Sequence, residues 1–317
     1  MITKAVHSML PILAALAGGW LAGRYLLSGM VNKGLVRLIG PLVWLMLFLI
    51  GVEFENALRS LDAVRQVMGA ALLMVVTTTA VPCLLLTMFF RPARSQVPIR
   101  RTLPSRKGLR ARGAAMLPAL RECGLAILMV SAGLVASAAM APSGISASPL
   151  GIPLSHVALM VLIVLVGVDL AGLDIKRHWF SRQVLSVPII VVAGSLLGAV
   201  VVHLVTGDDL RLLLALATGF GWFTLSSTLV GSLAGEIYGA TALFVDLGRE
   251  FVAIVLLYLL GRRHARLGIA AAGATAMDST LPIVRQTCRP EEVPMAFVSG
   301  FLLTLLAPFL ITAFLAR

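Results

Sequence analysis

Three ionisable residues stand close together in an otherwise apolar segment. Asp246, Arg249 and Glu250 lie in the run 240–260. Charged groups within membrane-spanning segments are costly and usually functional. In a helix, Asp246 and Glu250 share one face, and Arg249 can pair with Asp246. Glu250 would then be free to bind a cation or a proton. The alternative is a neutralised triad that only locks helices together.

A fourth acid, Asp278, lies among small and hydroxyl-bearing residues in the segment GATAMDSTLP, residues 273–282. Small residues let the backbone approach a ligand, and Pro282 prevents a regular helix from running through the segment. This pattern favours a ligand site, although an Asp that caps a short helix is an alternative. Neutral hydroxyl ligands are also available here, on Thr275, Ser279 and Thr280.

A second irregular segment, TGFGWFTLSST at 218–228, offers hydroxyls and flexible backbone but no charge. A helix that starts here would present N–H groups suited to a carboxylate. Trp222 is equally well explained as an anchor at the membrane interface. The candidate ligand-binding residues of this segment are Gly219, Gly221, Trp222, Thr224, Ser226 and Ser227.

The composition places these segments in a membrane protein. Of 317 residues, 59% are hydrophobic and 13% are charged, and the mean hydropathy is +0.99. Soluble domains are roughly 45–50% apolar and about 25% charged, so soluble and disordered classes are excluded. The net charge of +12 is typical of cytoplasmic loops rich in Lys and Arg. No basic module outside the spans suggests nucleic-acid binding.

The sequence predicts an all-α polytopic membrane protein with eight transmembrane helices and two re-entrant hairpins. The Lys and Arg distribution between the runs alternates consistently only if both termini lie outside and the segments 212–235 and 267–284 enter and leave on one side. We interpret the first run as an uncleaved span and not as a signal peptide. The predicted spans are 9–27, 35–52, 66–90, 122–141, 155–173, 183–206, 240–260 and 293–316.

Two weak internal repeats predict how these elements are organised. With a shift of about 115 residues, 17–23 aligns with 131–137 and 48–53 with 164–169, which gives two inverted three-span units. With a shift of 54, the hairpin segment 218–221 aligns with 272–275. Inverted repeats with broken segments are typical of secondary transporters. The predicted domains are a scaffold, 1–206, and a transport unit of two hairpin-plus-helix repeats, 207–317.

The order of spans and hairpins is similar to that of glutamate-transporter elevators, with the orientation flipped. That similarity implies a transport unit that slides against a fixed scaffold. The oligomeric state stays open, and a homodimer is one arrangement that would hold such a scaffold in place. The sequence contains no Walker motif, haem signature or HExxH, and we expect no enzyme, no cofactor and no metal site.

Three motifs resemble those of the bacterial lysine exporter family, LysO: GFGW at 219–222, FVDLGRE at 244–250 and LGIAAAGATAMDSTLP at 267–282. Their order and spacing match, and the resemblance is strongest over 155–317. It implies a multi-pass exporter of L-lysine and its analogue thialysine in the bacterial cytoplasmic (inner) membrane. It also implies an acidic pair, carried here by Glu250 and Asp278.

The residues are consistent with a proton-coupled mechanism. Lysine carries two ammonium groups and one carboxylate, and two intramembrane carboxylates suit a substrate that is a net cation. If they bind either substrate or protons, antiport follows from competition. The hydroxyls and backbone of the two hairpins would bind the substrate carboxylate. The alternatives are a cation/proton antiporter without organic substrate, and a non-transport intramembrane enzyme or sensor.

Overall fold

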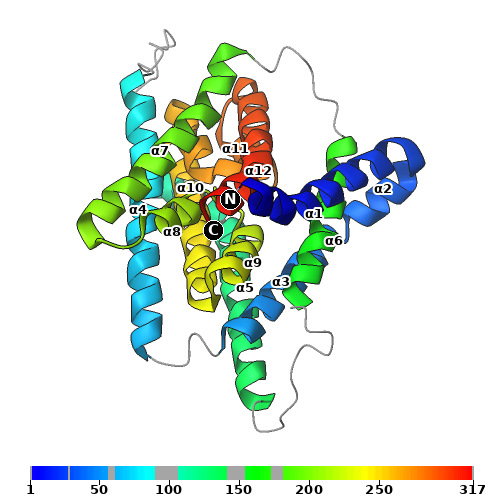
Figure 1. Ribbon diagram of the computed structural model, residues 1–317. Coiled ribbons are helices and arrows are strands. Elements are labelled where there is room, and N and C mark those ends of the chain that lie inside the picture. Colours follow the sequence, from blue (N-terminus) through cyan, green and yellow to red (C-terminus); the bar gives the residue numbers. More distant parts are fainter. Residues whose placement is uncertain are drawn as a thin grey trace.

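The computed structural model describes residues 2–27, 29–55, 61–89, 106–140, 154–172 and 181–315. Within these ranges the regular secondary structure is entirely helical, as Figure 1 shows, which confirms the all-α class. The count of eight spans, the re-entrant hairpins and the position of the termini stay predictions. Five helical segments of the described chain are long and apolar enough to cross a membrane: Met30–Phe54, Val64–Phe89, Leu154–Ala171, Arg182–Thr206 and Pro290–Leu315.

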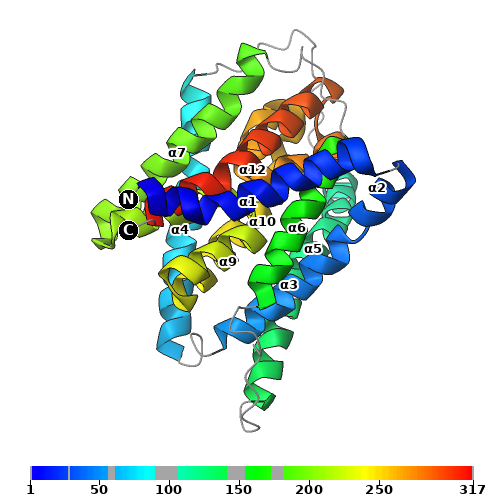
Figure 2. The ribbon, with the colours of Figure 1, turned by 45° about the vertical axis from the view of Figure 1, so that its right-hand side comes forward.

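One group of helices packs together on one side of the molecule, where α1 runs along α6 and α3 runs along α5. α3 also packs against α6, and Figure 2 shows α6 beside α3. Its helices are α1 (Ile2–Leu21), which continues into the π-helix η1 (Ala22–Leu26), α2 (Gly29–Val36), α3 (Ile39–Phe54), α5 (Arg106–Met140) and α6 (Leu154–Ala171).

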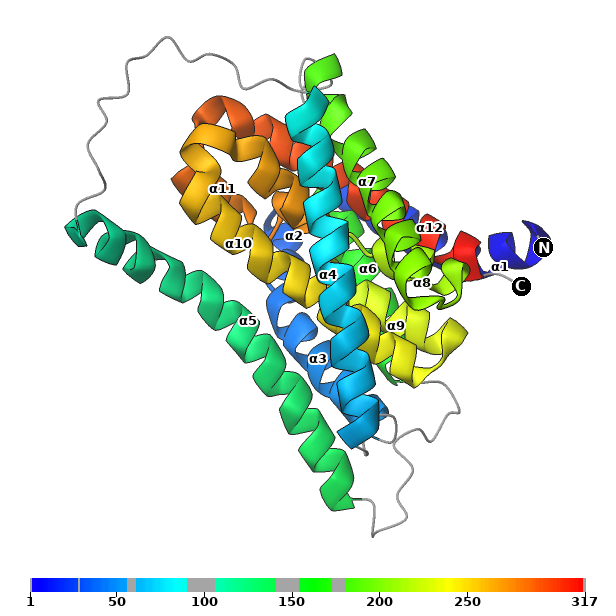
Figure 3. The same cartoon turned by 90° about the vertical axis from the view of Figure 1, so that its left-hand side faces the viewer.

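The second group contains the remaining helices, and α4 packs against both α7 and α10, as Figure 3 shows. The third helix of each predicted three-span unit, α4 or α7, therefore packs with the C-terminal part of the chain. The elements of this group are α4 (Leu61–Phe89), α7 (Arg182–Thr206), α8 (Leu210–Ala217), α9 (Phe223–Ala234), α10 (Glu236–Ala272), η4 (Gly273–Met277), α11 (Leu281–Thr287), η5 (Pro290–Glu292) and α12 (Val293–Leu315).

Glycine contacts in the first group follow the predicted repeat. Gly19 aligns with Gly133, and Gly51 aligns with Gly167. In the structure, a Cβ on Gly133 would lie 3.0 Å from the Cα of Gly51, and a Cβ on Gly167 would lie 3.1 Å from the carbonyl carbon of Gly19. Replacing each glycine by its aligned counterpart therefore turns the contact between Gly133 and Gly51 into the contact between Gly19 and Gly167. Two units related by a twofold axis would produce this exchange of contacts, and the inverted repeat itself stays a prediction.

The fifth helix differs from its prediction. The run 122–141 predicts a span, but α5 begins at Arg106 and extends over 35 residues. The segment before residue 122 is rich in Arg, Leu and Ala, which are strong helix formers. The helix therefore continues beyond the apolar run that marks the span.

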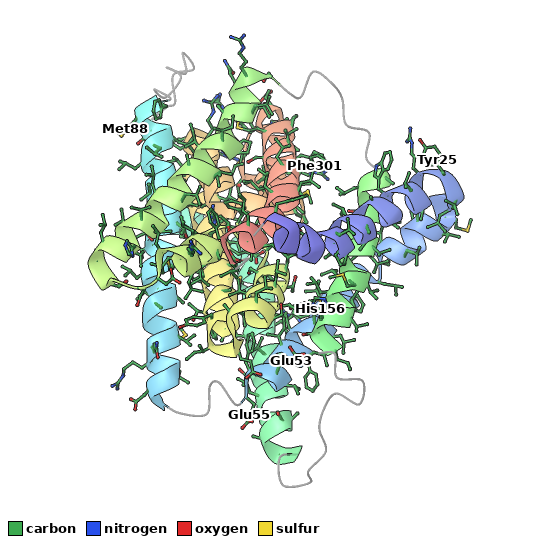
Figure 4. All side chains as sticks on the ribbon, viewed as in Figure 1. Tyr25, Glu53, Glu55, Met88, His156 and Phe301 are labelled. Atoms are coloured by element: carbon green, nitrogen blue, oxygen red, sulfur yellow. The ribbon has the colours of Figure 1, made fainter. Side chains whose placement is uncertain are left out.

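A helix cap joins α3 to α6 within this first group. The carboxylate of Glu53, at the end of α3, accepts hydrogen bonds from the backbone N–H of Ser155 (3.2 Å) and from its hydroxyl (2.6 Å). Figure 4 shows Glu53 and His156 at the same end of the molecule. Glu53 thus caps the start of α6, which explains its partial burial without a ligand.

The chain reverses direction within α10. His264 has non-helical backbone angles (φ −139°, ψ 54°). After this kink the helix folds back, because a Cβ on Gly268 would lie 3.3 Å from the Cα of Leu257. At the other end, α9 runs back along the start of α10, where a Cβ on Gly239 would lie 2.7 Å from the Cα of Gly231. The long first part of α10 is thus flanked by α9 at its start and by the segment after the kink, residues 265–272, at its end.

Candidate functional site

The two irregular segments predicted from the sequence meet beside the middle of the first part of α10. The backbone N–H of Ala274 donates a hydrogen bond of 2.7 Å to the carbonyl oxygen of Phe220. These two residues are aligned by the predicted 54-residue repeat. Gly221 (φ 92°), Gly273 (φ 64°) and Phe220 (φ 51°) all adopt left-handed backbone conformations. The helical chain is therefore broken by a local turn in each segment. The first break, residues 218–222, lies between α8 and α9, and the second break, residues 273–280, lies between α10 and α11.

Asp246 is directed at the first of these breaks. Its carboxylate accepts a hydrogen bond of 2.7 Å from the backbone N–H of Gly221 and another from the hydroxyl of Ser226. The side chain is 1% exposed. Gly221 lies just before α9, so the negative charge stands at the positive end of that helix.

Arg249 is directed at the second break. Its Nε donates to the carbonyl of Ala271 (2.9 Å), and its Nη2 donates to the carbonyl of Ala270 (3.0 Å). Nη1 donates to the hydroxyl of Ser195 on α7 (3.1 Å). The guanidinium carbon also lies 5.9 Å from the centre of the Phe220 ring, within cation–π range. The side chain is 1% exposed.

The expected pairing between Arg249 and Asp246 is corrected in one respect: their charges attract each other, but their hydrogen bonds go to other groups. Although three residues apart on one helix, the two side chains hydrogen-bond to opposite chain breaks and not to each other. The physical reason is that helix ends within the membrane lack backbone partners. A carboxylate and a guanidinium can satisfy those groups better than they satisfy one another.

The two other acids come together on Ser279. Its hydroxyl donates a hydrogen bond of 2.5 Å to Oε1 of Glu250, and its backbone N–H donates to the carboxylate of Asp278. Glu250 is buried, with 6% of its surface exposed, whereas Asp278 is exposed. The structure thus brings both carboxylates of the predicted acidic pair to one residue, Ser279.

Most of the other predicted hydroxyl ligands bond to the backbone of the two irregular segments. Thr275 donates to the carbonyl of Ala272 (3.0 Å), and Thr280 donates to that of Thr275 (2.9 Å). Ser227 donates to the carbonyl of Thr224 at 3.3 Å. The remaining predicted residues of this segment also lie at the break: Thr224 is buried in α9, Trp222 is half-buried, and Gly219 packs against Asp246.

Sequence reasoning did not identify Ser195 or the carbonyls of Ala270 and Ala271. Ser195 is one serine in a long apolar helix, 54 residues before Arg249, and no local pattern marks it. Among the residues the structure describes, no group of His, Cys, Asp and Glu side chains is arranged to hold a metal ion.

Comparison with known proteins identifies the family. The family model "Lysine exporter LysO" matches residues 127–315. The "Lysine exporter LysO" of Escherichia coli K12 is 31% identical over 294 residues, which cover 90% of this chain and 91% of that protein. The chain belongs to the lysine exporter family.

A second relative in the lysine exporter family, named "Putative lysine exporter", comes from Haemophilus influenzae Rd. It is 34% identical over 158 residues, which cover 49% of this chain and 81% of that protein. No solved structure matches the chain. The family is one of transporters and not of enzymes, so this chain is a multi-pass amino-acid exporter of the bacterial cytoplasmic membrane, as predicted.

The meeting of the two breaks predicts unequal effects of two glycine substitutions. Gly207 (φ 76°, ψ 4°) and Gly273 (φ 64°, ψ −121°) both have positive φ. Alanine costs about 1–2 kcal/mol of strain in the left-handed helical region of Gly207 and more at Gly273, which lies outside that region. A Cβ on Gly207 would meet nothing within 4 Å, whereas one on Gly273 would lie 3.1 Å from the carbonyl carbon of Phe220. Gly273→Ala should therefore cost about 1–3 kcal/mol more.

Thermal unfolding in detergent measures both variants, with Gly207→Ala as the matched control. A midpoint for Gly273→Ala as high as that for Gly207→Ala would contradict the close approach of the two breaks.

Proposed function

We propose that this protein exports L-lysine, and its analogue thialysine, from the cytoplasm in exchange for protons. The observation that carries the proposal is the joining of Glu250 and Asp278 through Ser279, beside two interrupted hairpins. Membership of a family whose relatives are named lysine exporters supports the choice of substrate. The partners are therefore the substrate, protons and the lipid bilayer.

The charges of the site match those of the substrate. Lysine at neutral pH carries two ammonium groups, and Glu250 and Asp278 provide two carboxylates. Opposite charges attract strongly where water is largely excluded. When the substrate is released, the same carboxylates take up protons, so that substrate and protons exclude each other. Exchange of lysine for protons follows from this competition.

The substrate carboxylate would bind to the hairpin backbone. The first N–H groups of a helix have no partner within that helix, and they attract anions. Asp246 bonds to Gly221, before the first turn of α9, which begins at Phe223. The substrate carboxylate would therefore bind to N–H groups of that turn that Asp246 does not engage. The hydroxyls of the hairpins, which mostly donate to nearby carbonyls, retain oxygen lone pairs and orient the surrounding backbone.

Alternating access would come from a slide between the two groups of helices. We propose that α1, α2, α3, α5 and α6 form the scaffold, and that α4 and α7 move with α8–α12. This moves the boundary predicted at residue 206. The hydrogen bond from Arg249 to Ser195 joins α10 to α7, and the Sγ of Cys83 on α4 lies 3.6 Å from the carbonyl of Leu267. A homodimer would hold the scaffold fixed.

One prediction from the proposed function concerns the acidic pair. Glu250→Gln and Asp278→Asn keep the side-chain shape but remove one charge each, so the two ammonium groups of lysine lose one of their two counter-charges in a site of low dielectric constant. Each variant should abolish lysine export at an unchanged protein level. Cellular resistance to thialysine and efflux of labelled lysine measure the effect.

Asp208→Asn is the matched control, because Asp208 is an exposed acid after α7, and it should export normally. Full export by either Glu250→Gln or Asp278→Asn would rule out the assigned roles. Normal thialysine resistance without any lysine efflux would favour a different substrate.

Another prediction concerns the proposed slide between the two groups of helices. Leu134 on α5, Val67 on α4 and Phe244 on α10 line one cavity of about 420 Å³. In a variant without native cysteines, cross-linking Leu134→Cys to Phe244→Cys should arrest export, because it joins the scaffold to the moving group. Cross-linking Val67→Cys to Phe244→Cys should leave export largely intact, because both helices move together.

Transport by cross-linked protein in proteoliposomes measures the difference, and each uncross-linked double variant is its own control. Arrest by both links would restore the boundary at residue 206. Export that survives both links would contradict the slide.

A further inference from the structure

We infer that Asp246 and Arg249 are positioning residues that hold the two interrupted hairpins in register, and that Ser195 on α7 orients Arg249. Both charged residues stood among the candidate substrate ligands. The inference deepens the proposed function, on which it rests, because it leaves Glu250 and Asp278 as the charged groups that meet the substrate.

The last carbonyls of α10 identify the task of Arg249. Four carbonyls at the end of a helix lack partners within it. The carbonyl of Ile269 accepts from the N–H of Gly273, and that of Ala272 accepts from the Thr275 hydroxyl. The two that remain belong to Ala270 and Ala271, and Arg249 donates to both. Arg249 thus completes the hydrogen bonding of this helix end.

Asp246 has the corresponding task at the other break. Its carboxylate bonds to the N–H of Gly221 and the hydroxyl of Ser226, at the start of α9. A negative charge is favourable at the start of a helix, and a positive charge is favourable at its end. The two residues therefore place opposite charges at opposite helix ends, on either side of the hydrogen bond between Ala274 and Phe220.

This arrangement removes Arg249 from the set of substrate ligands. Three of its N–H groups are directed at protein oxygens, Phe220 lies against its guanidinium, and its side chain is 1% exposed. A substrate carboxylate that bound Arg249 would have to displace the carbonyls of a helix end within the membrane. Those carbonyls would then have no partner, which is strongly unfavourable.

The test uses the full-length protein in detergent and three variants. Ser195→Ala removes one partner of Arg249, and Arg249→Lys keeps the charge but loses the planar fork of donors. Ser299→Ala is the control, because Ser299 is a fully buried serine whose hydroxyl has no partner in the described part of the chain. The probes are L-lysine and cadaverine, which is lysine without its carboxylate.

If Arg249 positions the hairpins, Ser195→Ala and Arg249→Lys should weaken binding of lysine and cadaverine by the same factor. The loss of one hydrogen bond to a charged group corresponds to roughly tenfold. Amide hydrogen exchange at residues 270–278 should accelerate by a similar factor, while the far end of α12 stays unchanged. Ser299→Ala should behave as wild type in both measurements.

Arg249→Lys that weakens lysine binding but not cadaverine binding would overturn the inference, because Arg249 would then contact the substrate carboxylate. Unchanged hydrogen exchange in both Ser195→Ala and Arg249→Lys would overturn it as well. The exchange measurement needs no ligand. Failure of the wild type to bind lysine would therefore contradict the proposed function while the positioning role is still tested.

Discussion

Backbone groups at interrupted helix ends must find hydrogen-bond partners where the membrane supplies no water, and the centre of this protein is organised around that constraint. Arg249 satisfies the end of α10, and Asp246 satisfies the start of α9. A single backbone hydrogen bond, from Ala274 to Phe220, joins the two breaks. Buried charge thus stabilises an irregular backbone, and that backbone can contact a ligand.

The separation of roles along one helix follows from this arrangement. Asp246 and Arg249 turn toward the two breaks, whereas Glu250 turns toward Ser279, whose backbone N–H bonds to the carboxylate of Asp278. The positive and negative charges that build the hairpins balance each other. Two carboxylates remain for a substrate with two ammonium groups, which links the packing of the hairpins to the proposed choice of lysine.

Sequence reasoning identified the parts of this site that have local signals. Asp278 stands out in a segment of small residues, and Asp246, Arg249 and Glu250 stand out as charges in an apolar run. It assigned Arg249 to Asp246 because spacing on a helix reports which residues are neighbours, and not which distant carbonyls need a donor. Ser195 has no local signal, since its partner lies on another helix.

In the fold, too, some features have a local signal in the sequence and others depend on long-range packing. The glycine motifs at Gly19, Gly51, Gly133 and Gly167 predicted two related units, and close contacts between those residues follow that relation. The grouping of α4 and α7 with the C-terminal helices depends on long-range packing. Apolar periodicity does not encode that packing, because helices that face lipid and helices that face protein are similarly apolar.

The most direct test of the account is transport by the purified protein in proteoliposomes. With an acidic lumen and no sodium gradient, labelled L-lysine should accumulate inside as protons leave, and Glu250→Gln should abolish the accumulation. Accumulation that follows a sodium gradient and ignores the proton gradient, or that persists in Glu250→Gln, would contradict the exchange of lysine for protons at the acidic pair.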